Sequence, residues 1–396
     1  MRVLLRTSTE KGHLNPMVGV AQHLMRLGHH VGWLTFPEPA GQLRRLGVEV
    51  LSLDGHLPPP PQVTGGEALA RLVLDPEALR RWIRRLLIEA VPSQVDPTRA
   101  AMRRFRPDVV ATDGMIYQGV IAAQLEGIPW AGVSTALTLL EPPDLDFALI
   151  RDVRSLAAER EALFAGYGLH PWFRTCECLS PALNVIFTTE DFVGSDASVP
   201  PATQLVGPSV PLGERGDEPP FPWERVHDTR LLVYVSFGSQ ISWQPELFSL
   251  IAGAAATLGV QVVMNAGDLA DSDFPATLPG DVVVVGYAPQ LALLQRAAVL
   301  VSHGGANSVM EALTHGVPLL LLPVCNDQPV QAYFLGKAGV GRSLNHRGLT
   351  VRALREALQA LLAEGSERVN ARRVQAAYRQ RDGAARAAEL IGGLAR

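Results

Sequence analysis

Short, nearly continuous apolar runs alternate with stretches of helical periodicity along the first part of the chain. Runs typical of strands buried on both faces occupy residues 2–6, 30–35, 108–112 and 130–133. A helix is predicted from Pro16, whose fixed φ suits a first helical position, to Gly28, and another over 119–126. Alternating strands and helices predict a parallel sheet with helices on both faces.

The same alternation starts again after residue 228. Strands are predicted at 230–236 and 260–265, with a helix at 245–258 between them. The preceding segment, 206–228, is rich in proline and glycine, which favours an extended connector. A long surface loop within one domain would have the same composition, but the second start of the pattern favours a linker.

We therefore predict an α/β protein with two Rossmann-like, doubly wound parallel-sheet domains. The first covers residues 1–205 and the second 229–378, with the linker at 206–228. The last residues, 379–396, continue a charged helical pattern.

Composition narrows the class of protein. The 396 residues suffice for two substantial cores, and 47% hydrophobic with 19% charged residues suits a soluble globular protein. A formal charge of -4 gives no basic field for nucleic acid. Three cysteines indicate reduced thiols, and Cys176 and Cys178 lack the second pair that a zinc site needs. Neither a signal peptide nor an apolar run of about 18 residues is found, so we expect a cytoplasmic protein without a transmembrane segment.

The most informative segment follows the short apolar run at 299–301. Gly304 and Gly305 allow a tight turn and a close approach of a ligand to the backbone. Asn307 and Ser308 are expected to cap the helix that follows. A helix N-terminus at the carboxyl end of a strand is suited to bind phosphate.

Polar side chains around this turn extend the motif. His303 adds a hydrogen-bond donor, and Glu311, one turn into the helix, can accept from two adjacent hydroxyls such as those of a ribose. Gly-Tyr-Ala-Pro-Gln at 286–290 precedes the turn and Asn-Asp-Gln at 326–328 follows it. Together these residues resemble the donor-binding signature of the UDP-sugar glycosyltransferases of the GT-B type, and the resemblance extends from the first strand to the end of the chain.

The resemblance implies two domains that face each other across a cleft, with the donor nucleotide bound by the second. Its nucleotide- and phosphate-binding positions fall on Ser239, Tyr287, Ala288, Gln290, His303, Gly305, Asn307, Ser308 and Glu311. Tyr287 stands where the plant enzymes carry a tryptophan that stacks on uracil, so it offers a smaller ring. Sugar-binding positions fall on Asp327, Gln328 and Thr135. The resemblance also implies that residues 66–106 and 140–182 line an acceptor pocket and that the final helix crosses back to the first domain.

Simpler roles are open for several of these side chains. Ser239 fits a plain turn, and a lone His303 can bond a backbone carbonyl. Glu311 alone can be a solvated helix carboxylate. Asp327 and Gln328 can form a turn before a helix that starts at Pro329.

His13 is the candidate general base. It lies in Lys-Gly-His-Leu-Asn-Pro, after the first strand, at the sheet edge where doubly wound folds bind ligands. Imidazole titrates near neutral pH, and the resemblance implies the same role. Asp113, at the end of 108–112, is the expected partner that orients the ring, as in other His–Asp pairs. Taken separately, His13 can be a capping residue and Asp113 a turn residue.

No metal is expected at this site. The helix N-terminus, His303 and Ser239 can neutralise the leaving diphosphate, which is the work of a cation elsewhere. Asp271 and Asp273 form an Asp-x-Asp string, but they lie in a polar loop and are expected to be a solvated turn.

The sequence thus predicts an inverting, metal-independent transferase. It would move a hexose, with glucose favoured, from a UDP-sugar to a hydroxyl of a small lipophilic acceptor, and TDP-sugar use stays open. No further cofactor is expected. A UDP-hexosamine epimerase and a non-catalytic nucleotide-sugar-binding accessory protein are the alternatives, and lipid-linked cell-wall transferases share the fold.

Overall fold

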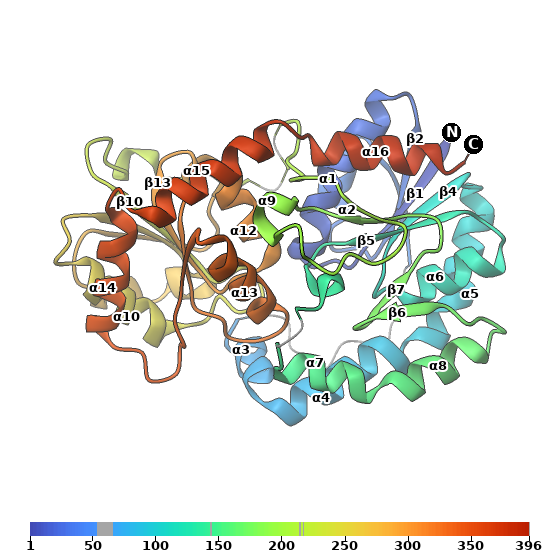
Figure 1. The fold of residues 1–396 in the computed structure, drawn as a ribbon, viewed down its shortest axis with the longest axis horizontal. Helices are drawn as coiled ribbons and strands as arrows, with labels where there is room; N and C mark the ends of the chain where they lie inside the picture. Colours follow the sequence, from blue (N-terminus) through green and yellow to red (C-terminus); the bar gives the residue numbers. More distant parts are fainter. Residues whose placement is uncertain (54–65, 143–144, 214, 217, 396) are drawn as a thin grey trace.

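The structure, a computed structural model, describes residues 1–53, 66–142, 145–213, 215–216 and 218–395 (Figure 1). Its two halves each contain one parallel sheet flanked by helices. The predicted α/β class with two doubly wound sheets is confirmed.

The first sheet has seven strands, and each of its strand pairs is parallel. Its order is β3 (Glu49–Ser52), β2 (His30–Thr35), β1 (Arg2–Arg6), β4 (Val109–Asp113), β5 (Trp130–Ser134), β8 (Asn184–Ile186) and β9 (Thr203–Leu205). Alternation along β1 shows how both faces are buried: Val3 and Leu5 enter one apolar cluster, and Leu4 enters another on the opposite face.

The second sheet has six strands, again paired in parallel. Its order is β12 (Val282–Val285), β11 (Gln261–Asn265), β10 (Leu232–Ser236), β13 (Ala297–Ser302), β14 (Leu319–Leu321) and β15 (Gly341–Ser343). A short antiparallel hairpin, β6 (Trp172–Arg174) and β7 (Glu177–Leu179), lies outside both sheets.

Helices cover both faces of each sheet. Those of the first half include α1 (Lys11–Arg26), α2 (Ala40–Arg45), α3 (Gly66–Leu74), α4 (Pro76–Arg84), α5 (Val91–Phe105), α6 (Tyr117–Leu125), α7 (Ala148–Ser155), α8 (Ala157–Ala165) and α9 (Glu190–Val193). Those of the second half include α10 (Pro245–Ala255), α11 (Gln290–Leu294), α12 (Ala306–Thr314), α13 (Gln328–Ala338), α14 (Val351–Leu362) and α15 (Ser366–Arg379). The last helix, α16 (Gly383–Gly393), packs on the first half. A π-helical turn, η1 (Arg85–Glu89), joins α4 to the segment before α5.

The strand order reverses at one place in each sheet. In the first sheet β1 lies between β2 and β4, and in the second β10 lies between β11 and β13. Ligands of doubly wound sheets bind beyond the carboxyl ends of the strands at such a reversal. The loops that follow β1, β4, β10 and β13 are therefore the places where a site is expected.

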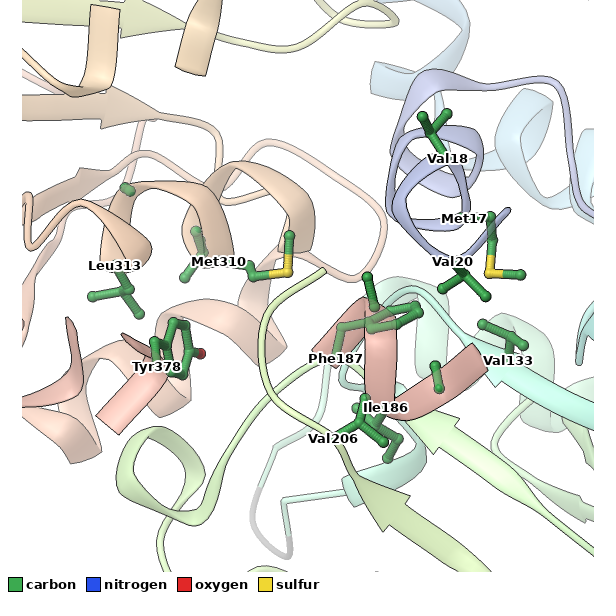
Figure 2. Close-up of a cluster of buried hydrophobic side chains, with 14 of the residues drawn as sticks. Met17, Val18, Val20, Val133, Ile186, Phe187, Val206, Met310, Leu313 and Tyr378 are labelled. Atoms are coloured by element: carbon green, nitrogen blue, oxygen red, sulfur yellow. The ribbon is translucent and has the colours of Figure 1, made fainter. Parts of the chain in front are cut away.

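One apolar cluster joins the two halves beneath these loops. It contains Leu5 of β1 and Tyr234 of β10, with side chains from α1, α12, α13 and α16 between them. Figure 2 shows Met17 and Val20 of α1 gathered with Val133 of β5 and Met310 of α12. The cluster fixes the start of α1 relative to the start of α12, because both helices are packed into the same core.

The end of the chain returns to the first half. Helix α15 packs on α12, and α16 lies along α1 with both chain termini nearby (Figure 1). The amide of Gly383 donates to the carbonyl of Pro208 at 3.0 Å, which ties the crossing to segment 206–228. The predicted terminal helix is broken between Arg379 and Gly383, and Asp382 caps α16 through the amide of Ala385.

The start of the first helix differs from the prediction. Helix α1 begins at Lys11, and Pro16 lies inside it. The first turn is held because the amides of His13 and Leu14 both donate to the carbonyl of Glu10, so a proline one turn later removes only one bond. His13 therefore belongs to a helix turn and not to a loop.

Candidate active site

A cavity of about 430 Å³ lies where the carboxyl ends of both sheets meet. It is lined from the first half by residues that include His13, Asp113 and Thr135, and from the second half by residues that include His303 and Asp327. Its volume falls in the range of about 300–1,000 Å³ that is usual for small-molecule sites. The catalytic and donor positions expected from the sequence, apart from Glu311, thus face one space.

His13 and Asp113 form a hydrogen-bonded pair. Nδ1 of His13 is 2.5 Å from Oδ2 of Asp113, whose other oxygen accepts the amide of Met115 at 2.9 Å. Asp113 is buried and is the last residue of β4, whereas the sequence predicted it as the first residue after that strand. Because β1 and β4 are neighbours, residues separated by 100 positions meet at the sheet edge. With Nδ1 engaged, Nε2 is the ring nitrogen left for proton transfer.

Thr135 is the third member of this group. Its Oγ1 lies 2.9 Å from Nδ1 of His13, so its hydroxyl contacts the base. It follows β5, the neighbour of β4 in the sheet. The predicted contact of Thr135 with a sugar stays a prediction, since the present contact is with the imidazole.

The surroundings of His13 set its protonation. Burial would lower the pKa of His13, but the charge and hydrogen bond of Asp113 oppose this and the pKa is raised to about 9. Glu10 and Asp327 act in the same direction. The free protein therefore carries imidazolium at neutral pH, and its proton is lost as the pH rises through about 9.

The N-terminus of α12 points its first amides at the other side of the cavity. Gly305 is the N-cap, in extended conformation, and it gives no side-chain cap. The expected capping by Asn307 and Ser308 is wrong, because both lie inside the first turn, where their side chains are past the cap position. Oδ1 of Asn307 is buried without a hydrogen-bond partner among the residues described, so it is available to a ligand. The first amides of α12 have no acceptor within the helix, as at any helix N-terminus, and such an arrangement is suited to an anion.

His303 is packed between two glycines. A Cβ at Gly238 would lie 2.9 Å from Cε1 of the ring, and a Cβ at Gly305 would lie 2.6 Å from Nε2. Burial lowers the pKa of His303 to about 4, partly offset by a hydrogen bond with the Ser236 backbone. The ring is neutral at pH 7, so it would act as a donor and not as a cation.

Glu311 is not a solvated helix carboxylate. Its side chain exposes 1% of its surface, and one oxygen accepts Nη2 of the buried Arg215. Its other oxygen accepts Nε2 of Gln290 at 2.7 Å. Arg215 was not predicted: it lies in the connector 206–228, where composition carries no sign of a contact with α12.

Tyr287 contacts the first half of the molecule. The ammonium of Lys11 lies 3.7 Å from the centroid of its ring. Ala288 is buried beside it, and both residues line the cavity with Gln290. The sequence pattern around Lys11 gave no sign of this cation–π contact.

Asp327 and Gln328 have different environments. Oδ2 of Asp327 accepts Nε2 of Gln331 at 2.7 Å, and burial raises the pKa of Asp327. Oε1 of Gln328 accepts the amides of Val324 and Cys325 at 2.7 and 3.0 Å, so this side chain braces the loop that ends in α13. Both residues line the cavity, and Asp327 is the one close enough to influence His13.

Ser239 and the Asp271–Asp273 string are the remaining predicted positions, and the question of a metal site concerns the second of them. Ser239 is exposed in the turn after β10 and lines the cavity. Asp271 and Asp273 are exposed, as expected of a solvated turn. Among the residues described, no group of three or more His, Cys, Asp or Glu side chains is placed to hold a metal ion. In the same parts of the chain, no helix is long and apolar enough to cross a membrane.

Known proteins share this architecture over its whole length. Residues 223–382 match the family model described as "UDP-glucoronosyl and UDP-glucosyl transferase". The NDP-glycosyltransferase YjiC of Bacillus subtilis is 27% identical over 96% of this chain and 94% of its own length. The 4'-demethylrebeccamycin synthase of Lentzea aerocolonigenes is 27% identical over 99% of both. A solved structure titled as the glycotransferase of kitacinnamycin superposes with a TM-score of 0.81 at 24% identity, covering 100% of this chain and 99% of that one.

The family match lies on the half that carries the α12 turn, and the relatives span both halves and the cleft between them. The chain is therefore an enzyme, a glycosyltransferase of the GT-B type, and its second half is similar to the UDP-glycosyltransferase family.

Proposed function

We propose that this enzyme transfers a hexose, glucose-like, from a pyrimidine nucleoside diphosphate sugar to a hydroxyl of a small lipophilic acceptor, with inversion. The observation that carries the proposal is the His13–Asp113 pair, at 2.5 Å, across the cavity from the N-terminus of α12. UDP is the nucleotide favoured by the sequence, and TDP is the other one considered.

In this mechanism Nε2 of His13 takes the proton of the acceptor hydroxyl. The acceptor oxygen then forms a bond with the anomeric carbon on the face opposite the diphosphate, and the bond from that carbon to the phosphate oxygen breaks. Asp113 stabilises the imidazolium that forms. The nucleoside diphosphate leaves with the electron pair, next to the amides of α12 and the neutral His303.

We propose that the transfer needs no metal. Amides at a helix N-terminus, with an uncharged imidazole donor, can stabilise the negative charge of the leaving group in a site that excludes water. The described side chains that surround this position offer hydrogen-bond donors and not a cluster of anionic ligands.

The first half of the cavity suits a lipophilic acceptor. Apolar side chains from α4, η1 and α7 line it, among them Trp82, Leu87 and Val153. Gln94 and Gln118 add one polar spot, with Nε2 of Gln118 donating to Oε1 of Gln94 at 2.8 Å. These elements belong to the segments 66–106 and 140–182, which the family resemblance assigns to the acceptor pocket.

The test combines nucleotide binding with transfer. Thermal shifts with UDP, TDP, GDP and ADP, without added metal, should show selective stabilisation by a pyrimidine nucleotide of about 2.7 kcal/mol at roughly 100-fold the Kd. His13→Ala should reduce transfer by about 10²–10⁴-fold while nucleotide binding persists.

His23→Ala is the matched control. His23 lies on the same helix and also faces an aspartate, Asp382 at 3.3 Å, but outside the cavity. This variant should retain transfer. Unchanged turnover of His13→Ala would exclude His13 as the base.

A further inference from the structure

Arg215 reaches from the connector 206–228 into the donor half of the cavity. Its guanidinium pairs with one oxygen of Glu311, and Gln290 donates to the other at 2.7 Å. Arg215 and Gln290 line the cavity, whereas Glu311 lies behind them with 1% of its side chain exposed. The carboxylate expected to receive ribose hydroxyls is thus covered by a charged partner.

The backbone around Arg215 is held from the first half of the molecule. Gln42 of α2 donates Nε2 to the carbonyl of Arg215 at 3.0 Å, and Arg45 donates Nη2 to the carbonyl of Gly216 at 2.6 Å. The carboxylate of Glu218 accepts the amides of Arg215 and Gly216, at 2.6 and 2.9 Å. Arg215 is therefore fixed at its backbone by one domain and at its guanidinium by the other.

The Arg215–Glu311 pair should give the site different affinities for ribose and deoxyribose nucleotides. A 2'-hydroxyl that is to donate to Glu311 must first displace Arg215, and breaking a buried ion pair leaves both charges unpaired. A deoxyribose lacks that hydroxyl and can bind with the pair intact. A carboxylate without this partner would favour ribose over deoxyribose, because the 2'-hydroxyl would form a charge-assisted hydrogen bond with it.

We propose that Arg215 is a specificity-determining residue of the donor site, and that the donor nucleotide is a 2'-deoxyribonucleoside diphosphate of the thymidine type. This inference rests on the proposed function, because it takes the turn after β13 as the nucleotide site. It resolves the choice between UDP and TDP in favour of TDP.

The test compares three nucleotides by calorimetry on the intact protein. UDP and dUDP differ only in the 2'-hydroxyl, and dUDP and TDP differ only in the 5-methyl group, so the pairs separate the contribution of the sugar from that of the base. We expect dUDP and TDP to bind at least tenfold more tightly than UDP. Equal or tighter binding of UDP than of dUDP overturns the inference.

A variant identifies the residue responsible. Arg215→Met keeps much of the length of the side chain and removes its donors, so Glu311 becomes open to a 2'-hydroxyl and the preference for dUDP over UDP should fall by tenfold or more. Arg45→Ala, which loosens the same connector from an exposed position, should keep the wild-type preference. If Arg215→Met keeps the preference, Arg215 is not the determinant.

Two further outcomes are distinguished. If Arg215→Met does not fold, judged by circular dichroism, adding Glu311→Gln removes the unpaired charge, and the amide oxygen can still accept a 2'-hydroxyl, so the preference should again fall. A double variant that retains the wild-type preference contradicts the proposal. If wild-type protein binds none of the three nucleotides, the proposed donor site itself is wrong, and not only its choice of sugar.

Discussion

The ammonium of Lys11 lies 3.7 Å from the centre of the Tyr287 ring and joins the first turn of α1 to the loop after β12. The two residues come from different domains, and both line the cavity. The cation–π contact joins the two domains at the edge of the cavity. If the donor base stacks on Tyr287, as proposed, the contact couples its position to the helix that carries His13.

Tyr287→Ala should weaken nucleotide binding. Loss of a stacking ring costs about 1–3 kcal/mol per base, or roughly 5- to 150-fold in Kd. Tyr287→Phe keeps the ring and should bind within about threefold of wild type, whereas Tyr287→Trp, with its larger ring, should bind more tightly. Calorimetry with TDP and UDP measures all three, and wild-type affinity in Tyr287→Ala would exclude a stacking role.

The activity should rise toward alkaline pH. In the proposed mechanism neutral His13 is the base, and its pKa is raised to about 9, so kcat/KM should increase with pH and level off above that value. Asp113→Asn removes the carboxylate charge responsible for much of the rise. The midpoint should then move to lower pH while the plateau rate falls, because the imidazolium is no longer stabilised. A midpoint that stays in place in Asp113→Asn contradicts the assignment.

The contribution of the His13–Asp113 pair to stability should change with pH in the direction opposite to the activity. The folded-state pKa of His13 is above the unfolded value, so the pair stabilises the fold fully below about 6.5 and this contribution is lost as the pH rises through about 9. Thermal unfolding of wild type and Asp113→Asn from pH 6 to 9.5 should show a difference that shrinks with pH. A difference independent of pH would mean that the pair does not titrate in this range.

The sheets could be predicted from the sequence because buried parallel strands consist of consecutive apolar residues, as in Val299, Leu300 and Val301 of β13. The start of α1 could not, since Pro16 is a good first residue by its own geometry and the bonds to Glu10 that extend the helix backwards are visible only in the fold. The capping by Asn307 was wrong for a related reason: the chain enters α12 one residue before the polar side chains begin.

The site was predictable where it follows the strand ends. His13 and Asp113 meet because β1 and β4 are adjacent, which the doubly wound order implies. Arg215 was not predictable, because its partner Glu311 lies 96 positions away and the connector has no periodicity that fixes a side chain. Contacts between irregular segments depend on how the two halves pack together, and this packing cannot be inferred from the local pattern of residues in the sequence.

Glu177 should make the fold less stable at alkaline pH. Its buried carboxyl accepts Oγ of Ser134 at 3.0 Å and the hydroxyl of Thr138, and burial, followed by the charge of Asp113, raises its pKa to about 8. The folded pKa is above the unfolded one, so stability present below about pH 4.5 is lost as the pH rises toward 8. Relative to wild type, Glu177→Gln should gain melting temperature between pH 5 and 8. Glu190→Gln, at an exposed position, should show no such trend, and a parallel course for wild type and Glu177→Gln would exclude this carboxyl as the source.

Gly305→Ala should weaken the binding of the donor more than it alters the fold. The added Cβ would lie 2.6 Å from Nε2 of His303, so the ring must leave the α12 N-terminus or the turn must move, and either change separates the two groups proposed to hold the diphosphate. We expect at least a tenfold rise in the Kd for TDP, about 1.4 kcal/mol.

Gly336→Ala is the control, because that glycine lies within α13 with no atom within 4 Å of its added Cβ, and alanine should stabilise the helix by about 0.5–1 kcal/mol. Wild-type affinity in Gly305→Ala would show that His303 does not need its present position, and the diphosphate would then be held by the amides of α12 alone.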